Sequence, residues 1–532
     1  MNRLIKNKIF LNIKNHDIIK YLKNCILPAT VFITGACVLI VEIVATRILS
    51  PFYGNTIFTV SSVISVILSA LSIGYYIGGR FSDRHPSLRY FFSIILLSGL
   101  ILLLSHSISI AILPTLSHTF PVSVGPLVSS LLLFFTPAFL LGTLSPYAVK
   151  LQSISFPEQG VGSIAGNIFF WSTLGSILGS LSAGFVLIPY FGINQIVITN
   201  SFLLVSLGLI PLLIIGKKKD LKRIIFALII LILASLYILN AAKKDVVYIK
   251  DGIYEEITVY DKVLSGRPTR FFQQDRSSSG AMYLDSNDPK DLVYDYSKYY
   301  SLYKIFNPEI KNALVIGGGA YSIPKALLAD LPNATVDVSE IEPSLFNIAK
   351  QYFNLENNPR LHNYTKDGRR LLNDSKKNYD LIFSDVYYSL FSIPAHFTTQ
   401  EFFSLAKNKL NENGIFMANI IGDLSQQQPS LIMSEIKTFR TIFPNSYFFA
   451  TKAPDNIKPQ NIIFVGYKSN KRISLHSQLI TTNSDPIIRS IEEKQIDISK
   501  FDLTPYPILT DNYSPVEFLT SRVLQRSINH QN

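Results

Sequence analysis

The chain has 532 residues, too many for one ordinary core, and only 16% of them are charged, against about a quarter in soluble domains. The net charge of +12 would suit a nucleic-acid-binding protein, but many cations stand in short clusters beside apolar segments, as in membrane proteins. The sequence has no basic and aromatic RNA-binding motif, so we expect no nucleic-acid partner. Both cysteines, Cys25 and Cys37, fall in or beside the first apolar segment, which excludes a thiolate zinc site in the second half.

The first half is predicted to be a bundle of membrane helices, with the lipid bilayer as its partner. Crossing the hydrocarbon takes about 20 mostly apolar residues, and by this length the sequence has about seven candidate spans. The basic N-terminus lacks a small-residue cleavage site, so the first span is an anchor and not a signal peptide. The candidates are residues 26–49, 57–79, 90–113, 121–147, 163–188, 196–215 and 224–239.

The loop charges predict the orientation of this bundle. Segments 80–89 and 216–223 are basic, whereas segments 50–56, 114–120 and 189–195 lack Lys and Arg. The positive-inside rule then places the N-terminus in the cytoplasm of a multi-pass protein of the cell (inner) membrane. An odd number of spans would place the second half outside, so its side stays open at this stage.

The second half begins near Lys243 and is predicted to be a separate α/β domain. Segments 246–261 and 269–284 alternate like strands and predict a small β-rich part over residues 243–311. From Asn312 onward, strands and helices alternate, which predicts a parallel, Rossmann-like sheet with crossover helices over residues 312–532. Residues 1–242 form the membrane domain in this division.

A glycine turn opens the α/β domain. Residues 313–316 form a short apolar strand, Gly317, Gly318 and Gly319 follow at once, and residues 323–328 open a helix. This order lets the backbone approach a ligand at the end of a strand. The glycines alone are equally well explained by a tight turn.

Acidic residues follow the next strands. Glu340 ends the second strand about 20 positions past the glycines, where a carboxylate can take both ribose hydroxyls. Asp367 follows the third strand and could accept from an adenine amino group, or simply cap the helix at 369–373. Asp385 ends the fourth strand, at the edge of an open sheet where ligands bind. One acid at each successive strand end favours an S-adenosyl nucleoside over NAD.

These residues resemble the spermidine synthase-like aminopropyltransferases, in particular the branch fused to an N-terminal membrane bundle. The matching segments are 35–47, 74–84, 314–319, 340–343, 367–369, 379–385, 394–403 and 509–517. The resemblance implies transfer of an aminopropyl group from decarboxylated S-adenosylmethionine to a small amine such as putrescine. The reaction implied by this resemblance requires no metal, and the resemblance is compatible with a homodimer. It implies Asp385 as the base, with the nucleoside held by Gly317, Gly318, Gly319, Glu340, Asp367 and Gly368.

The sequence departs from the family on the acceptor side of the site. The family has aspartate directly after the third glycine, where this chain has Ala320. A second family aspartate, which binds the far ammonium of a diamine, is here Tyr388, and the family's Tyr-His-Glu triplet is Tyr294-Asp295-Tyr296. We expect Tyr294 and Asp295 to replace part of the lost contacts, with Tyr388 and His396 also near the substrate.

The sequence leaves two other functions open. The departures at Ala320 and Tyr388 would suit transfer of a methyl group from S-adenosylmethionine to another small acceptor. Alternatively, the bundle could transport a small molecule, with Glu42 inside its first span and a degenerate soluble domain that only senses a nucleoside.

Overall fold

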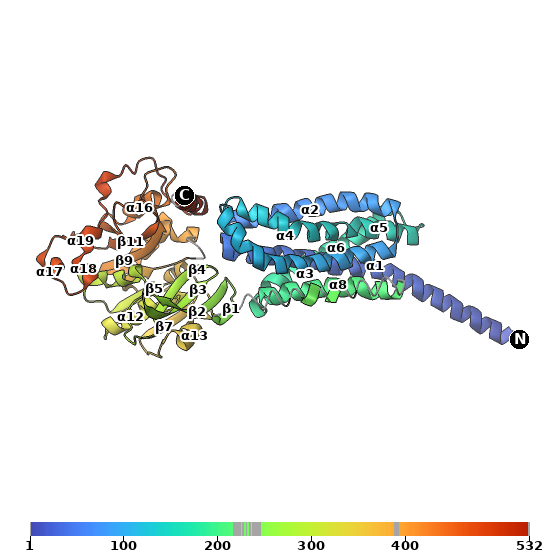
Figure 1. The fold of residues 1–532 in the computed structure, drawn as a ribbon, viewed down its shortest axis with the longest axis horizontal. Helices are drawn as coiled ribbons and strands as arrows, with labels where there is room; N and C mark the ends of the chain where they lie inside the picture. Colours follow the sequence, from blue (N-terminus) through green and yellow to red (C-terminus); the bar gives the residue numbers. More distant parts are fainter. Residues whose placement is uncertain are drawn as a thin grey trace. The chain divides into compact units, whose positions relative to one another are not determined.

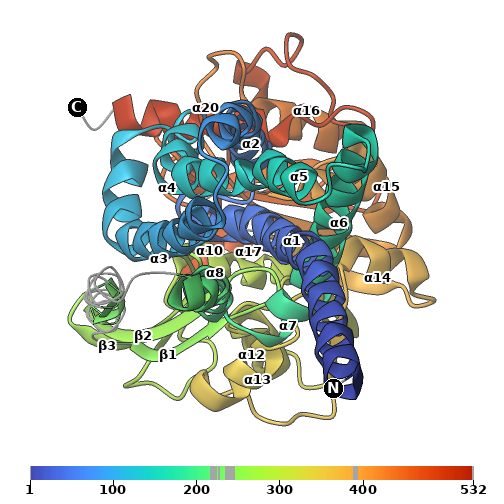
Figure 2. The same cartoon turned by 90° about the vertical axis from the view of Figure 1, so that its right-hand side faces the viewer.

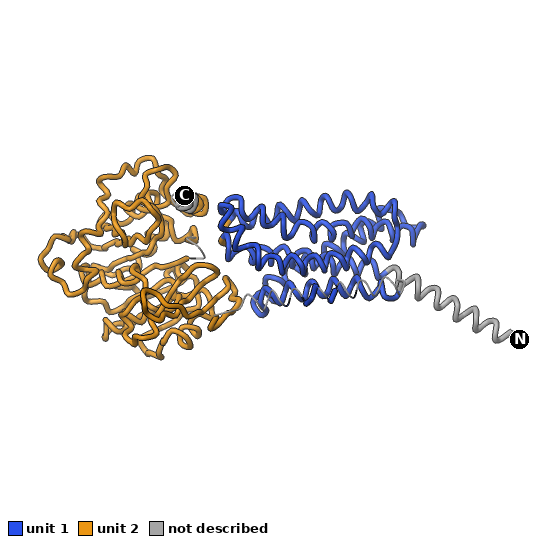
Figure 3. The backbone as a smooth tube through the Cα atoms, in the orientation of Figure 1, with its two compact units in different colours: residues 1–53, 57–244 blue, residues 54–56, 245–532 orange. Residues whose placement is uncertain are grey.

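The computed structural model describes residues 2–215, a few positions between 225 and 236, 246–387 and 393–529, with side chains described from residue 25 to residue 523 within these ranges. The chain divides into two compact units (Figure 3). Unit 1 holds Met1–Tyr53 and Ile57–Lys244, and unit 2 holds Gly54–Thr56 and Asp245–Asn532. The predicted boundary at 242 and 243 lies outside the described residues.

Unit 1 is a bundle of long helices, seen lengthwise in Figure 1 and nearly end-on in Figure 2. Among the described residues, six helical segments are long and apolar enough to cross a membrane, by length and composition. Five of them start within three residues of the predicted starts, and the fourth starts four residues later, at Gly125. The seventh candidate, at 224–239, falls mostly outside the described residues. The elements are α1 (Asn2–Tyr53), α2 (Ile57–Arg84), α3 (Leu88–Thr119), α4 (Gly125–Gly142), α5 (Leu144–Ser155), α6 (Val161–Ser182), η1 (Ala183–Leu187), α7 (Ile188–Tyr190) and α8 (Ile193–Ile215).

Small residues allow α1 and α6 to pack closely. A Cβ atom on Gly175 would lie 1.9 Å from the carbonyl oxygen of Phe32, and one on Gly179 would lie 2.4 Å from that of Ala36. Larger side chains at these positions would push the helices apart. The Gly-x-x-x-Gly spacing therefore brings two helix backbones into contact, as it does in membrane bundles.

Unit 2 begins with a small antiparallel sheet in the order β1-β2-β3-β4 (Figure 1). Each predicted strand segment contains a turn and gives two strands. The strands are β1 (Val246–Asp251), β2 (Glu256–Leu264), β3 (Arg267–Gln274) and β4 (Ser277–Tyr283), and α10 (Asp295–Lys298), η2 (Tyr299–Leu302) and α11 (Tyr303–Phe306) follow.

The larger sheet has the order β10-β11-β9-β8-β5-β6-β7. Five neighbouring strands, β7, β6, β5, β8 and β9, are parallel, and their connections are helical as predicted. The prediction of a wholly parallel sheet is wrong at β11, which runs antiparallel to both β9 and β10. No helix lies between β10 and β11 among the described residues, so these two strands form a hairpin, and a hairpin is antiparallel.

The buried faces of this sheet form two apolar clusters, one on each side. Val315 and Val338 belong to one cluster, and Leu314 and Ile382 belong to the other. The core elements are β5 (Asn312–Ile316), α12 (Ser322–Asp330), β6 (Thr335–Glu340), α13 (Leu345–Tyr352), β7 (Leu361–Thr365), α14 (Gly368–Asp374), β8 (Tyr379–Ser384), η3 (Ala395–Phe397), α15 (Gln400–Asn408), β9 (Leu410–Gly422), α16 (Leu431–Ile442), β10 (Ser446–Ala450) and β11 (Gln460–Tyr467). The C-terminal elements are α17 (Gln478–Thr481), α18 (Pro486–Arg489), α19 (Ile491–Lys494), η4 (Ile498–Lys500) and α20 (Val516–Asn529).

Candidate active site

A cavity opens in unit 2 at the carboxyl ends of β5, β6 and β8. β5 lies between β6 and β8, so the strand order reverses at this point, and open α/β sheets bind ligands at such a reversal. The cavity brings together most of the residues predicted from the sequence. Those that line it are Gly317, Gly318, Gly319, Glu340, Asp367, Gly368, Asp385 and Tyr294. Tyr388 lies outside the described residues.

The glycine turn is required by the backbone path and by close packing. Gly317 has φ +90° and Gly319 has φ +51°, both in the left-handed region that favours glycine. A Cβ atom on Gly317 would lie 2.1 Å from the carbonyl oxygen of Asp385. The turn therefore lies directly against the loop that carries the predicted base. The glycines form a tight turn and also line the cavity, so the two explanations of them are compatible.

Glu340 holds this turn. Its Oε2 accepts hydrogen bonds from the backbone N–H of Gly318 at 2.8 Å and of Gly319 at 3.4 Å, and its Oε1 accepts from the N–H of Glu342 at 2.9 Å. Burial raises the pKa of Glu340, although these three N–H donors oppose the effect. The carboxylate thus has a fixed orientation at the cavity wall, with acceptor capacity left for ribose hydroxyls.

Asp367 caps helix α14 and also lines the cavity, so both roles considered for it, helix cap and adenine acceptor, are compatible with its position. Its Oδ1 accepts from the N–H of Arg370 at 2.9 Å and so caps α14, as the simpler interpretation predicted. Its Oδ2 lies 3.0 Å from Nε2 of His396, which places that predicted residue against Asp367 and not among the lining of the cavity. Burial raises the pKa of Asp367, but the contacts with His396 and Arg370 outweigh it and the pKa is lowered overall.

Asp385 is half-buried in the cavity wall, just past the end of β8. Its Oδ1 accepts from Nδ2 of Asn419 at 2.9 Å, and the hydroxyl of Tyr296 donates a second hydrogen bond. Asn461 in turn donates to Oδ1 of Asn419 at 2.9 Å, which fixes that amide. Burial raises the pKa of Asp385, while the two donors favour its ionised form. This carboxylate is oriented in the way a general base needs to be.

Two tyrosines form the wall beside Asp385. The rings of Tyr294 and Tyr296 lie nearly parallel, with centroids 6.0 Å apart and an interplanar angle of 14°. Asp295, between them, does not line the cavity: it is exposed and pairs with Lys298 at 2.9 Å. The structure therefore does not place Asp295 among the lining residues of the cavity, because successive residues at the start of a short helix point in different directions.

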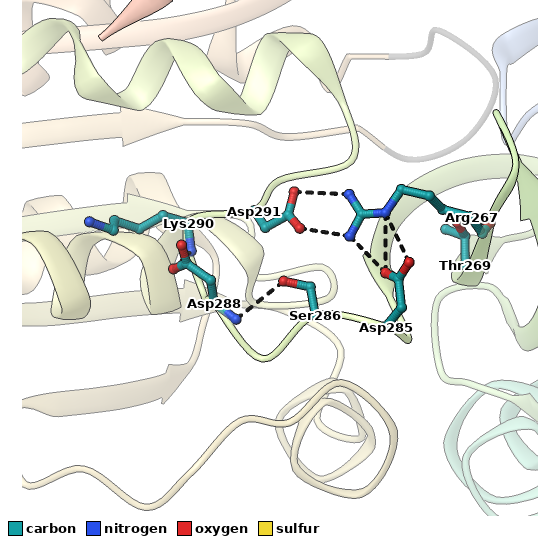
Figure 4. Close-up of polar contacts among 7 residues, drawn as sticks. All are labelled: Arg267, Thr269, Asp285, Ser286, Asp288, Lys290 and Asp291. Carbon is teal, nitrogen blue, oxygen red and sulfur yellow. Dashed lines mark hydrogen bonds and ion pairs between the residues drawn. The ribbon is translucent and has the colours of Figure 1, made fainter. Parts of the chain in front are cut away.

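Arg267, at the start of β3, binds the segment that precedes these tyrosines through Asp285 and Asp291 (Figure 4). Its guanidinium forks between Asp285, with Nη2 to Oδ1 at 2.7 Å, and Asp291, with Nη2 to Oδ2 at 2.8 Å. It also lies 3.6 Å from the centroid of the Tyr283 ring. These contacts join β3 to the loop that leads into Tyr294, so the aromatic wall is anchored on a strand.

Sequence reasoning missed two polar residues of the site, Glu255 and Asn419. Glu255 lies in the turn between β1 and β2, its Oε1 accepts from Gln274, and its Oε2 has no hydrogen-bond partner among the described residues. Burial, together with the charges of Asp275 and Glu340, raises its pKa well above the usual range. Asn419 comes from β9, 34 residues beyond Asp385. Only the pairing of strands brings these side chains to the cavity, and neither stands in a recognisable motif.

Comparison with known proteins agrees with this geometry. The spermine/spermidine synthase domain family matches residues 301–477. A polyamine aminopropyltransferase of Vibrio vulnificus is 23% identical over 303 residues, which cover 56% of this chain and 97% of that protein. Polyamine aminopropyltransferase 2 of Aquifex aeolicus is 22% identical over 408 residues, or 74% of this chain and 78% of that protein. This second match is longer than unit 2 and so extends into the helical half.

Among solved structures, a probable spermidine synthase from Corynebacterium glutamicum is similar at 18% identity and a TM-score of 0.42, over 50% of this chain and 97% of that one. The domain match covers the larger sheet, whose strand ends form the cavity. Residues 301–477 therefore carry a spermine/spermidine synthase domain, and the chain is similar to polyamine aminopropyltransferases.

Proposed function

We propose that this chain is a membrane-anchored enzyme that transfers an aminopropyl group from decarboxylated S-adenosylmethionine to a small amine, with putrescine as the first acceptor to test. The observation that carries the proposal is Asp385, a carboxylate at a strand end held by Asn419 and Tyr296 in the same cavity as Glu340 and Asp367. The six apolar helices of unit 1 supply the anchor.

The charge of the cavity favours the decarboxylated donor. Four carboxyl groups line it, on Glu255, Glu340, Asp367 and Asp385. Among the described residues that line the cavity, Lys366 is the one basic side chain, and it pairs with Asp374 at 2.9 Å. S-adenosylmethionine carries an α-carboxylate, which ionised Asp367 and Asp385 would repel, whereas its decarboxylated form offers only a sulfonium and an ammonium. The cavity therefore suits a cationic donor better than a zwitterionic one.

The reaction needs a base and correct alignment. The acceptor amine has a pKa of about 10 and is mostly protonated in neutral water. Asp385 removes a proton from the ammonium, and the freed lone pair attacks the aminopropyl carbon next to sulfur. The carbon–sulfur bond breaks with its electrons going to sulfur, which leaves neutral 5′-methylthioadenosine. The contacts of Asp385 and Glu340 hold base and ribose in place, so alignment supplies much of the acceleration.

Aromatic faces take the place of the missing family acids on the acceptor side. Tyr294 and Tyr296 line the cavity beside Asp385, and the face of a tyrosine ring attracts an ammonium group. Such a wall would hold one cation without demanding a second at a fixed distance. We therefore expect a broader range of amine acceptors than two fixed carboxylates would allow.

The full-length protein in detergent, supplied with decarboxylated S-adenosylmethionine and putrescine, is expected to form spermidine and 5′-methylthioadenosine in equal amounts. Asp385→Asn should lower the rate by about 10²–10⁴-fold, the usual effect of removing a general base. Asp295→Asn is the matched control, because that carboxylate lies on the same segment as Tyr296 but outside the cavity. It should leave the rate unchanged.

Other outcomes would favour the remaining functions. Methylated product from S-adenosylmethionine, with no turnover of the decarboxylated donor, would replace aminopropyl transfer by methyl transfer. Solute uptake into vesicles that survives Asp385→Asn and fails on Glu42→Gln would favour transport. Formation of 5′-methylthioadenosine with another amine, but not with putrescine, would keep the reaction and change the acceptor.

A further inference from the structure

The segment after Leu509 matches the family motif near the C-terminus, yet none of its residues line the cavity. It is hydrogen-bonded along its length to the segment around His396. The N–H of Gln400 donates to the carbonyl oxygen of Leu509 at 2.8 Å, and the N–H of Asp511 donates to Oε2 of Glu401 at 2.9 Å. Further along, the hydroxyls of Thr398 and Ser514 lie 2.9 Å apart.

Asp511 is the centre of these contacts. Nη1 of Arg369 donates to its Oδ1 at 2.7 Å and Nη2 donates to its Oδ2 at 2.5 Å, which is a two-pronged ion pair. The hydroxyl of Thr399 also donates to Oδ1, at 2.8 Å. The guanidinium of Arg369 lowers the pKa of Asp511, so the pair is charged at neutral pH.

Arg369 passes this constraint on to the cavity. Its Nη1 also donates to the carbonyl oxygen of His396 at 3.1 Å, and the ring of His396 contacts Oδ2 of Asp367 at 3.0 Å. Asp367 lines the cavity, and its other oxygen is fixed by the N–H of Arg370. The orientation of the Asp367 carboxylate therefore depends on where His396 is held, and Arg369 and Asp511 hold it.

We propose that Asp511, acting through Arg369 and His396, is a positioning residue that sets the carboxylate of Asp367 to recognise the amino group of adenine. The proposal rests on the proposed function, because it assumes that the cavity binds an adenine nucleoside. An exposed ion pair alone would contribute little to stability. Two-pronged geometry and a link through His396 to a cavity carboxylate give this pair a role in recognition.

The test compares two nucleosides that differ in the base. The binding of 5′-methylthioadenosine and of 5′-methylthioinosine to the full-length protein is measured by calorimetry, because the inosine lacks the amino group. We expect the wild type to prefer the adenosine, and Asp511→Asn to reduce that preference by about tenfold, the value of one hydrogen bond to a charged group. Asp502→Asn is the control, since that exposed carboxylate accepts from Thr504 within its own turn.

A double variant distinguishes positioning from a general effect on folding. If Asp511 acts through Arg369, adding Arg369→Gln to Asp511→Asn should change the preference no further. An equal loss of affinity for both nucleosides, or an unchanged preference, would overturn the proposal. A wild type that binds neither nucleoside would instead refute the proposed function, and this proposal with it.

Discussion

Asp385 is a half-buried carboxylate that accepts from two neutral donors, and its raised pKa predicts how activity depends on pH. Burial raises its pKa, and only the ionised form can take a proton, so activity is lost as pH falls through that raised pKa. Asn419→Ala removes a hydrogen bond that favours ionisation, so the pKa should rise further. The acid limb of kcat/KM is then expected to move to higher pH than in the wild type.

The control for this shift is Asn461→Ala, which acts one step away, through the amide of Asn419. It should move the limb less than Asn419→Ala does. A limb that stays in place in both variants would show that the titrating group is not Asp385.

The stability of Asp385→Asn gives an independent check at neutral pH. A carboxyl whose pKa is raised on folding makes the folded state less stable above its unfolded pKa, because ionisation is then costlier in the fold. The neutral amide avoids this cost, so the variant is expected to unfold at the same temperature as the wild type or higher. A clear fall in Tm would mean that lost activity reflects lost structure.

The site residues readable from the sequence are those that follow a strand directly. Glu340 and Asp385 could be predicted because each ends an apolar run at the ligand-binding edge of the sheet. Asn419 could not, because its place beside Asp385 depends on the pairing of β8 with β9. Tyr296 stands where the family has glutamate, and nothing in the local sequence shows that its hydroxyl faces the base and that Asp295 faces solvent.

At the scale of elements, the glycine turn between β5 and α12 allows the cost of a left-handed backbone to be separated from the cost of a steric clash. Gly317→Ala introduces a left-handed alanine, which costs about 1–2 kcal/mol, and a Cβ atom 2.1 Å from the carbonyl oxygen of Asp385. Such overpacking costs about 1–3 kcal/mol more. The variant should lose both stability and activity, because relief of the clash displaces the loop that carries the base.

Gly266→Ala is the matched control. Gly266 has φ +83°, close to that of Gly317, and a Cβ atom there would meet nothing within 4 Å. The difference in free energy of unfolding between the two variants, measured by denaturant titration, therefore isolates the clash. Equal losses would show that the loop of Asp385 gives way without cost.

Strands β5 to β8 and helices α12 and α14 were predictable because apolar runs and turn residues mark them. The direction of β11 was not, since direction depends on the length of the β10–β11 connection and not on the strand's own residues. The β1–β2 and β3–β4 turns were also missed. Asp275 makes the second of them with φ +51°, a conformation that aspartate adopts less readily than glycine.

At the scale of the whole molecule, charged residues of unit 1 gather near the helix ends at one side of the bundle. α2 and α5 end on the same side of the bundle, where Lys150 pairs with Asp83 at 2.8 Å. Arg84 and Arg89 flank the turn between α2 and α3 on that side, and the basic segment 217–223 follows α8. With six spans, the N-terminus, this turn and segment 217–223 all fall on one side, as the positive-inside rule requires for the cytoplasm.

The side of unit 2 then depends on residues 224–239, which number only 16, against the roughly 20 that a span needs. We predict that they do not cross, so that the active site faces the cytoplasm, where a nucleoside donor is made. Green fluorescent protein fused after Asn532 should therefore fluoresce, and alkaline phosphatase at the same position should be inactive. Alkaline phosphatase fused after Gly192, between α7 and α8, is the control and should be active. An active phosphatase after Asn532 would place the domain outside and require its donor to be delivered across the membrane.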